Sequence, residues 1–282
     1  MNILVTGANG FIGKHLCDYL GNQSHNVLKI VRKNAGDFEN TFELELTDAN
    51  AVQVFIDGMK DQKIDTIIHL AASLANVEQG YGEQIQVLLD NIEITRNVIK
   101  LVKALNLQKL INFSSMAVYP NTDGIFSEDS QIKMSQNTDC FYGLSKFCSE
   151  NIIDHALMRQ EVIISHLRIA QVYGEGMCNN RIIPIMKQEL EDKNTITVFG
   201  EGKRKSNFIG VEKLMRFLNY FIVNDLEGIY NIGDESMSYF QLAKKIINEK
   251  GNRDSVIILK TAGIRSKFHL DTNKFEIIMR EI

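Results

Sequence analysis

The chain has 282 residues, of which 44% are hydrophobic and 23% are charged, a composition that suits one large globular domain or two closely joined ones. Its 31 Lys and Arg residues nearly balance 35 Asp and Glu residues, whereas proteins that bind duplex nucleic acid usually carry a basic excess. No apolar run approaches the roughly 18 residues that cross a bilayer, and the first residues lack the basic segment and apolar core of a signal peptide. We therefore expect a cytoplasmic protein whose partners include neither nucleic acid nor a membrane.

Cysteines and histidines give no sign of a metal centre. Cys17, Cys140, Cys148 and Cys178 are scattered without a C-x-x-C pair, and the six histidines form no H-E-x-x-H motif. Structural zinc sites need such closely spaced ligands. We expect neither a bound metal nor a disulfide framework.

Strand and helix patterns alternate over the first 170 residues. Strand-like runs lie at 3–6, 27–31, 42–46, 65–72, 109–114 and 162–167. Helical periodicity occupies 12–21, 49–59, 84–105 and 141–159. This alternation predicts a parallel sheet with helices on both faces, the doubly wound α/β architecture.

The order is less regular beyond residue 170. Helical patterns lie at 182–190, 211–223 and 239–248, with a strand pattern at 196–199. We predict that residues 1–170 form the doubly wound domain and that 171–282 are mainly a small α/β substrate-binding cap. A segment near 206–233 is expected to return to the first domain.

The first predicted strand leads into a turn with three glycines, Gly7, Gly10 and Gly13, and a helix follows directly. A dinucleotide pyrophosphate needs this arrangement, because glycines let the backbone approach the phosphates and the helix N-terminus offers unpaired N–H groups. A bare glycine pattern can also be an ordinary strand-to-helix turn. Strand, turn and helix together favour a dinucleotide-binding Rossmann fold.

The end of the second predicted strand selects between NAD and NADP. An acidic residue about 20 positions past the glycines binds the ribose 2′-OH of NAD, but this chain has Arg32 and Lys33 there. A guanidinium can bind a 2′-phosphate through two hydrogen bonds. We therefore predict NADP as the cofactor, with NAD as the alternative if the pair is only a solvated strand end.

Tyr142 and Lys146 are four residues apart, so a helix places both on one face. A nearby ammonium lowers the pKa of a phenol from its usual value near 10, so Tyr142 could exchange a proton with a carbonyl oxygen. Taken alone, Y-x-x-x-K is common on helix surfaces. Ser115 strengthens the pattern, because it stands at the carboxyl end of a predicted strand, where ligands of such sheets bind.

The segments TGANGFIG, HLAA, FSSMAVY, YGLSK and LRIAQVYG follow one another along the chain. In this order they resemble the extended short-chain dehydrogenase/reductase family of nucleotide-sugar epimerases, dehydratases and ketoreductases. The resemblance implies that Ser115, Tyr142 and Lys146 are the catalytic triad. The cofactor contacts that the patterns and the resemblance together predict are Gly7, Asn9, Gly10, Phe11, Ile12, Gly13, Arg32, Lys33, Glu45, Leu46, Leu70, Ala71, Ala72, Asn91, Tyr142, Lys146 and Ile169.

The resemblance also implies a homodimer. In that assembly the helices at 84–105 and 141–159 of two subunits form a four-helix bundle. Their apolar faces could equally belong to the core of a single chain.

The residues that follow Ser115 separate the reactions of this family. Dehydratases resemble one another in an Asp-Glu pair that supplies the acid and base for water elimination, whereas this chain has Met116-Ala117. Epimerases usually retain NAD and an acidic second strand. The resemblance thus implies an NADPH-dependent reductase of a nucleotide-linked 4-keto-6-deoxy sugar, in deoxysugar or polysaccharide biosynthesis. An NAD-dependent nucleotide-sugar 4-epimerase is the alternative enzyme, and an NADP-sensing regulator is the alternative without catalysis.

The family commonly binds the substrate pyrophosphate with an Arg at the position of Ser206. Arg181, Arg204 and Lys205 are candidates to replace it, although each could be a solvated surface charge. The expected contacts to the nucleotide-sugar substrate are Ser115, Asn179, Arg181 and Arg204.

Overall fold

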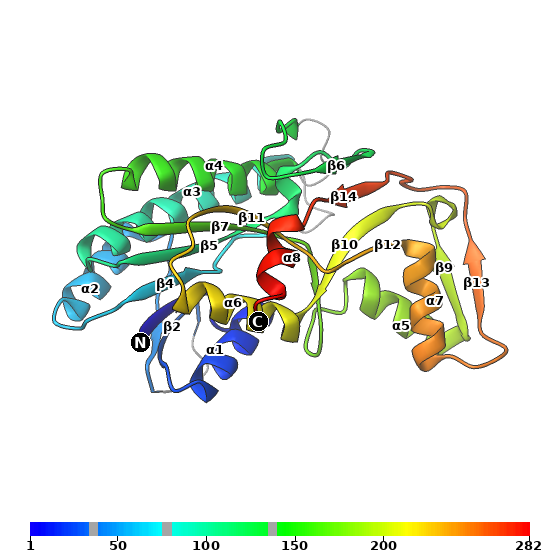
Figure 1. Ribbon diagram of the computed structural model, residues 1–282, viewed down its shortest axis with the longest axis horizontal. Coiled ribbons are helices and arrows are strands. Elements are labelled where there is room, and N and C mark those ends of the chain that lie inside the picture. The colour runs from blue at the N-terminus through cyan, green and yellow to red at the C-terminus, as the bar shows by residue number, and fades with distance from the viewer. Residues whose placement is uncertain (34–38, 75–80, 135–139) are drawn as a thin grey trace.

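The computed structural model describes residues 1–33, 39–74, 81–134 and 140–282. Its centre is a seven-stranded parallel sheet in the order β11-β7-β5-β4-β1-β2-β3 (Figure 1). The strands are β1 (Asn2–Thr6), β2 (Asn26–Val31), β3 (Thr41–Glu43), β4 (Thr66–His69), β5 (Lys109–Ser115), β7 (Ile163–Ile169) and β11 (Gly228–Ile232). The predicted doubly wound α/β fold is confirmed.

Helices cover both faces of this sheet (Figure 1). One face carries α1 (Phe11–Asn22), α6 (Val211–Val223) and α8 (Asn273–Met279), and the other carries α2 (Ala49–Met59), α3 (Tyr81–Ala104) and α4 (Cys140–Leu157). Neighbouring residues of a strand point to opposite faces. Accordingly, Ile68 of β4 enters the core beside α1 and α6, whereas Ile67 enters the core beside α2, α3 and α4.

Many of the predicted element boundaries agree with the structure. The helices expected at 49–59 and 211–223 are α2 and α6 to the residue. The strand expected at 42–46 is wrong at its end, because β3 stops at Glu43. The chain then turns so that the Asp48 side chain can accept the first amides of α2.

The strand expected at 65–72 is also too long. β4 ends at His69, and the next residues leave the sheet to pass against the backbone of Gly7. The Ala71 amide donates to the Thr6 hydroxyl at 3.2 Å instead of to a neighbouring strand. The loop after β4 is thereby fixed beside the loop after β1.

The other elements build a cap beyond one end of the sheet (Figure 1). Ile183, Met186, Leu242 and Ile246 of two helices pack there on buried strand residues. The elements are β6 (Gly124–Phe126), β8 (Gln171–Tyr173), α5 (Ile182–Lys193), β9 (Thr195–Val198), β10 (Lys205–Gly210), β12 (Glu235–Ser238), α7 (Tyr239–Lys250), β13 (Val256–Leu259) and β14 (Phe268–Leu270). They form the sheets β12-β10-β8, β13-β9 and β14-β6.

The chain crosses between cap and central sheet more than once. After β10, α6 packs on α1 and β11 pairs with β7 in the central sheet. No helix among the described residues has the length and apolar character that a membrane crossing demands.

Candidate active site

The loops after β1 and β4 meet at the carboxyl edge of the sheet. In doubly wound sheets, ligands bind beyond this edge where the strand order reverses, which here is between β1 and β4. Gly7 has a φ of +70°, a left-handed conformation that glycine adopts readily. A Cβ on Gly7 would lie 2.9 Å from the Ala71 nitrogen. The predicted contacts Leu70 and Ala71 therefore lie directly against Gly7, and Ala72 follows them in the same loop.

The start of α1 fits a pyrophosphate. The Gly10 amide donates to the Gly7 carbonyl at 3.0 Å, and a Cβ on Gly13 would lie 2.3 Å from that carbonyl oxygen. α1 begins at Phe11 with no side-chain cap and no acidic residue in its first turn. Its first amides thus keep no partner within the helix and lie at the positive end of its dipole. An anionic dinucleotide suits this position.

The predicted adenosine contacts gather beside the glycine loop, with one feature that sequence patterns did not indicate. Arg32 Nε lies 3.4 Å from the Glu45 carboxylate, and both side chains are exposed. Asn9 donates to the Lys33 carbonyl at 3.5 Å. The basic side chain expected at a 2′-phosphate is therefore already paired with an acid.

α4 presents its Tyr142 and Lys146 side chains to the end of β5. Lys146 Nζ lies 5.9 Å from the centre of the Tyr142 ring. The same ammonium is buried and donates to the Phe113 carbonyl oxygen at 2.8 Å. Ser115 ends β5 two residues later, and its Oγ accepts the Ala117 amide at 3.1 Å. The three predicted catalytic residues thus come from the two elements that meet at the carboxyl edge of the sheet.

Gly143, next to Tyr142, permits this close approach. A Cβ on Gly143 would lie 2.1 Å from the Ala117 carbonyl oxygen. Any larger residue would push the start of α4 away from the segment that follows Ser115. The functional importance of this glycine was not predicted from the sequence, because it depends on a contact between distant segments.

Burial shifts two ionisable groups at this edge. It lowers the pKa of Lys146 to about 8, while the nearby Glu150 carboxylate opposes that shift. Burial and the Lys146 charge lower the pKa of His69 to about 3. At neutral pH, Lys146 is therefore mostly charged and His69 is neutral, with the His69 Nδ1 2.8 Å from the Thr6 hydroxyl.

Asn91 of α3 connects the loop after β4 to α4. Its Nδ2 donates to the Ser73 carbonyl and to Ser145 Oγ, each at 3.0 Å, and its Oδ1 accepts the Ser73 amide at 2.7 Å. Ser145 in turn donates to the Tyr142 carbonyl at 2.7 Å. Asn91 therefore holds the surroundings of Tyr142 in place, and its direct contact with a cofactor stays a prediction.

A buried ion pair lies behind these residues and was not identified from the sequence. Arg168 Nε and Nη2 donate to the two Glu150 oxygens at 3.0 and 2.7 Å. Ser114 donates its hydroxyl to the same carboxylate. The signal was available: Glu150 stands four residues after Lys146 on α4, and Arg168 lies in the strand that pairs with β5.

In the cap, Arg204 has the features of a ligand-binding side chain. Its guanidinium carbon lies 5.0 Å from the centre of the Tyr239 ring, and its buried Nε has no hydrogen-bond partner among the described residues. Gln171 Nε2 donates to Ser206 Oγ at 2.9 Å on the neighbouring strand. By contrast, Asn179 and Arg181 are exposed ahead of α5.

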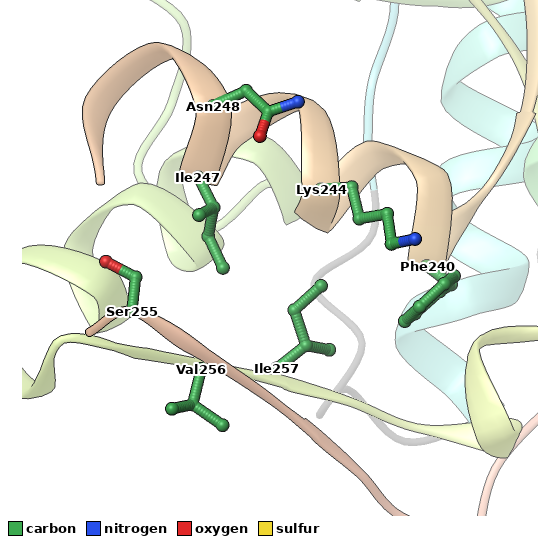
Figure 2. Close-up of a pocket in the computed structure, with 7 residues that line it drawn as sticks. All are labelled: Phe240, Lys244, Ile247, Asn248, Ser255, Val256 and Ile257. Atoms are coloured by element: carbon green, nitrogen blue, oxygen red, sulfur yellow. The ribbon is translucent and has the colours of Figure 1, made fainter. Parts of the chain in front are cut away.

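A pocket of about 520 Å³ lies between α7 and β13 (Figure 2). Its lining is mostly apolar, and Lys244, which points along Phe240, is the one charged side chain among the seven that line it. None of the residues at the end of β5 or the start of α4 line this pocket. Among the described residues, no group of His, Cys, Asp and Glu side chains converges as metal ligands would.

A doubly wound sheet with a glycine loop, and with Ser, Tyr and Lys at its carboxyl edge, defines a nicotinamide-dinucleotide enzyme of the extended short-chain type. The family model described as NAD dependent epimerase/dehydratase family matches residues 3–233. The chain belongs to that family.

Similar proteins act on nucleotide sugars. The chain is 26% identical to a dTDP-D-glucose 4,6-dehydratase of Dictyostelium discoideum over 87% of its length, but it spans only 61% of that relative. It is 24% identical to a dTDP-4-dehydro-6-deoxy-D-allose reductase of a Streptomyces species, with 90% of this chain and 82% of the relative covered.

A solved structure supports the fold. The UDP-glucuronic acid 4-epimerase of Bacillus cereus, in complex with UDP-glucuronic acid and NAD, matches with a TM-score of 0.80 and 23% identity. The match covers 99% of this chain and 93% of that one.

Proposed function

We propose that this protein is an NADPH-dependent reductase of the 4-keto group of a nucleotide-linked 4-keto-6-deoxy sugar. In this proposal residues 1–170 bind the cofactor and 171–282 mainly bind the sugar nucleotide. The single observation that carries the choice of reaction is the pair Met116-Ala117, directly after Ser115 at the end of β5. Neither side chain can move a proton, so the elimination of water has no acid or base there.

The chain's own residues have separate tasks in this reaction. A nicotinamide dinucleotide held by the glycine loop would supply the hydride. The Ser115 hydroxyl donates a hydrogen bond to the sugar 4-keto oxygen, and Tyr142 gives its phenolic proton to that oxygen as it becomes an alcohol. Lys146 stabilises the phenolate that remains, because its ammonium is held charged close to the ring.

The cap supplies the substrate's anchor in this proposal. Arg204 donates to the diphosphate of the sugar nucleotide, since its buried Nε has no partner in the part of the chain that the structure describes and its guanidinium packs on the Tyr239 ring. A guanidinium binds phosphate oxygens through paired hydrogen bonds. Arg204 would thus take the role of the arginine that the family commonly has at the position of Ser206. Arg181 and Asn179 are exposed, so their contacts with the substrate are less well supported.

One observation favours a second enzyme, an NAD-dependent nucleotide-sugar 4-epimerase. Arg32 is paired with Glu45, so the adenosine end of the site is less positive than the sequence indicates. An uncharged ribose 2′-OH would suit that pairing better than a phosphate. The two enzymes differ in a simple way, because the reductase consumes NADPH and the epimerase does not.

The test is incubation with dTDP-, UDP-, GDP- and CDP-linked 4-keto-6-deoxy sugars while NADPH absorbance is followed. The proposal expects oxidation of NADPH with at least one of them, and near-complete loss of that rate in Tyr142→Phe with NADPH binding retained. Conversion of a 4-hydroxy sugar nucleotide, such as UDP-glucose, to its C4 epimer without added NADPH would support the second candidate. Binding of NADP without any turnover would support the regulator.

We also propose that two copies associate through α3 and α4. Light scattering after gel filtration tests the assembly, and a monomeric mass at assay concentration would contradict it.

A further inference from the structure

Successive turns of α4 form hydrogen bonds with successive residues at the end of β5. Lys146 donates to the Phe113 carbonyl oxygen at 2.8 Å, and one turn later Glu150 accepts the hydroxyl of Ser114, the next residue of the strand. Tyr142 lies one turn earlier on the same helix. Residues spaced by four share a helix face, so the phenol, the ammonium and the carboxylate form one row.

Glu150 is held in a single orientation. Its side chain is 2% exposed and that of Arg168 is 3% exposed. Arg168 binds both carboxylate oxygens, at 3.0 and 2.7 Å, and it donates a further hydrogen bond to Tyr119 Oη at 2.7 Å. A carboxylate with three donors on its two oxygens has little freedom to turn away from its neighbours.

The charges around Lys146 are few. Among the described residues, α4 contributes Tyr142 and Glu150, β4 contributes His69, and β7 contributes Arg168 behind Glu150. β5 contributes uncharged groups. Since His69 is neutral at neutral pH, Glu150 is the anion that balances two buried cations.

We propose that Glu150 is a positioning residue, which keeps the Lys146 ammonium charged and seated against β5. Ser114 and Arg168 fix its carboxylate for that task. The inference rests on the proposed function only in its last step, in which the charged Lys146 stabilises the Tyr142 phenolate.

A purely structural ion pair makes a different prediction. If Glu150 served only to neutralise Arg168, its loss would lower stability but leave the ionisation of Lys146 unchanged. If Glu150 holds the Lys146 charge, its loss must make Lys146 release its proton at lower pH, because burial then acts without an opposing anion. The direction of that change separates the two accounts.

Lysine ionisation can be measured without any substrate. Protein labelled with ¹³C at lysine Cε is titrated by NMR, and the Lys146 resonance is assigned by its absence in Lys146→Arg. In the wild type we expect its midpoint near the pKa of about 8. In Glu150→Gln the midpoint should fall by about one pH unit or more, the usual effect of a close opposite charge. Glu150→Asp, which keeps the charge, should restore part of the shift.

Two further variants keep the test decisive. Glu150→Gln leaves Arg168 buried and unpaired, so the double variant Glu150→Gln/Arg168→Gln is titrated as well, and its midpoint should also lie below that of the wild type. Asp154→Asn is the matched control, because Asp154 stands one turn beyond Glu150 on α4 and binds His166 instead. Its midpoint should equal that of the wild type.

The outcomes distinguish this inference from the proposed function. An unchanged Lys146 midpoint in Glu150→Gln and in the double variant would overturn the positioning role, whatever the enzyme's substrate. A lowered midpoint without any sugar-nucleotide turnover in the wild type would leave the positioning role standing and remove the proposed function. With turnover, the alkaline limb of the rate profile should move to lower pH in Glu150→Gln and stay in place in Asp154→Asn.

Discussion

Arg32 Nε lies 3.4 Å from the Glu45 carboxylate at the end of β2. We propose that this pair influences the choice of cofactor, because Arg32 Nε must turn from Glu45 to reach a 2′-phosphate. Both side chains are exposed, so the cost of that turn is small.

Cofactor preference should therefore change in opposite directions at the two positions. Arg32→Asp should weaken NADPH relative to NADH by about tenfold or more, since a hydrogen bond to a charged group is worth about 1.5–3 kcal/mol. Glu45→Gln should strengthen NADPH relative to NADH, because it releases Arg32. Fluorescence titration of both reduced cofactors measures the ratio, and an unchanged ratio in both variants would remove this pair from cofactor selection.

Gly143→Ala should destabilise the protein and lower turnover. Alanine is normally better than glycine in a helix by about 1 kcal/mol, but here its Cβ would lie 2.1 Å from the Ala117 carbonyl oxygen. We expect a net loss of about 1–3 kcal/mol, as in other overpacked sites. Gly58→Ala in α2 is the control, because that Cβ would meet none of the described residues within 4 Å, and it should be neutral or stabilising. Urea denaturation of the three proteins decides the point, and equal stability of Gly143→Ala and the wild type would contradict the packing argument.

Arg204→Gln should raise the KM for the sugar nucleotide by tenfold or more and leave kcat nearly unchanged. The reason is that a diphosphate contact is made equally before and during the reaction. Lys203→Gln removes a neighbouring exposed charge that pairs with Glu201, and its KM should stay at the wild-type value. Steady-state kinetics with a sugar nucleotide that supports NADPH oxidation gives both constants, and a tenfold fall of kcat at constant KM would place Arg204 elsewhere in the reaction.

Acid should destabilise the protein through His69. Burial lowers the pKa of His69 in the folded state to about 3, against an ordinary value of 6.5. Below pH 6.5, His69 therefore binds a proton in the unfolded chain but stays neutral in the folded chain. Stability is then lost as the pH falls from 6.5 toward 3, at roughly 1.4 kcal/mol per pH unit. Between pH 6.5 and 5 the loss is about 2 kcal/mol. His69→Asn should lose correspondingly less over this range in denaturant unfolding, and an equal loss in both proteins would contradict the assignment.

The sequence was sufficient for features that repeat along the chain. Periodicity predicted α2 and α6 to the residue, and the glycine spacing and the Tyr142–Lys146 spacing both report local geometry. It was insufficient where segments far apart in the chain meet. The Glu45 partner of Arg32, the Ala117 contact of Gly143 and the Arg168 partner of Glu150 all depend on tertiary packing. The strand expected at 196–199 corresponds to β9 (Thr195–Val198). The other short cap strands were not predicted, because three or four residues are too few to show a period.

The most direct test of the proposed reduction follows a label into the product. NADPH that carries deuterium at the transferable position of its nicotinamide is incubated with dTDP-4-keto-6-deoxyglucose, and the sugar is analysed by NMR and mass spectrometry. The account predicts one deuterium at C4 of each product molecule and one NADP formed with it. No deuterium at C4 and no NADPH consumed, together with conversion of a 4-hydroxy sugar nucleotide to its C4 epimer in a parallel incubation without NADPH, would contradict it.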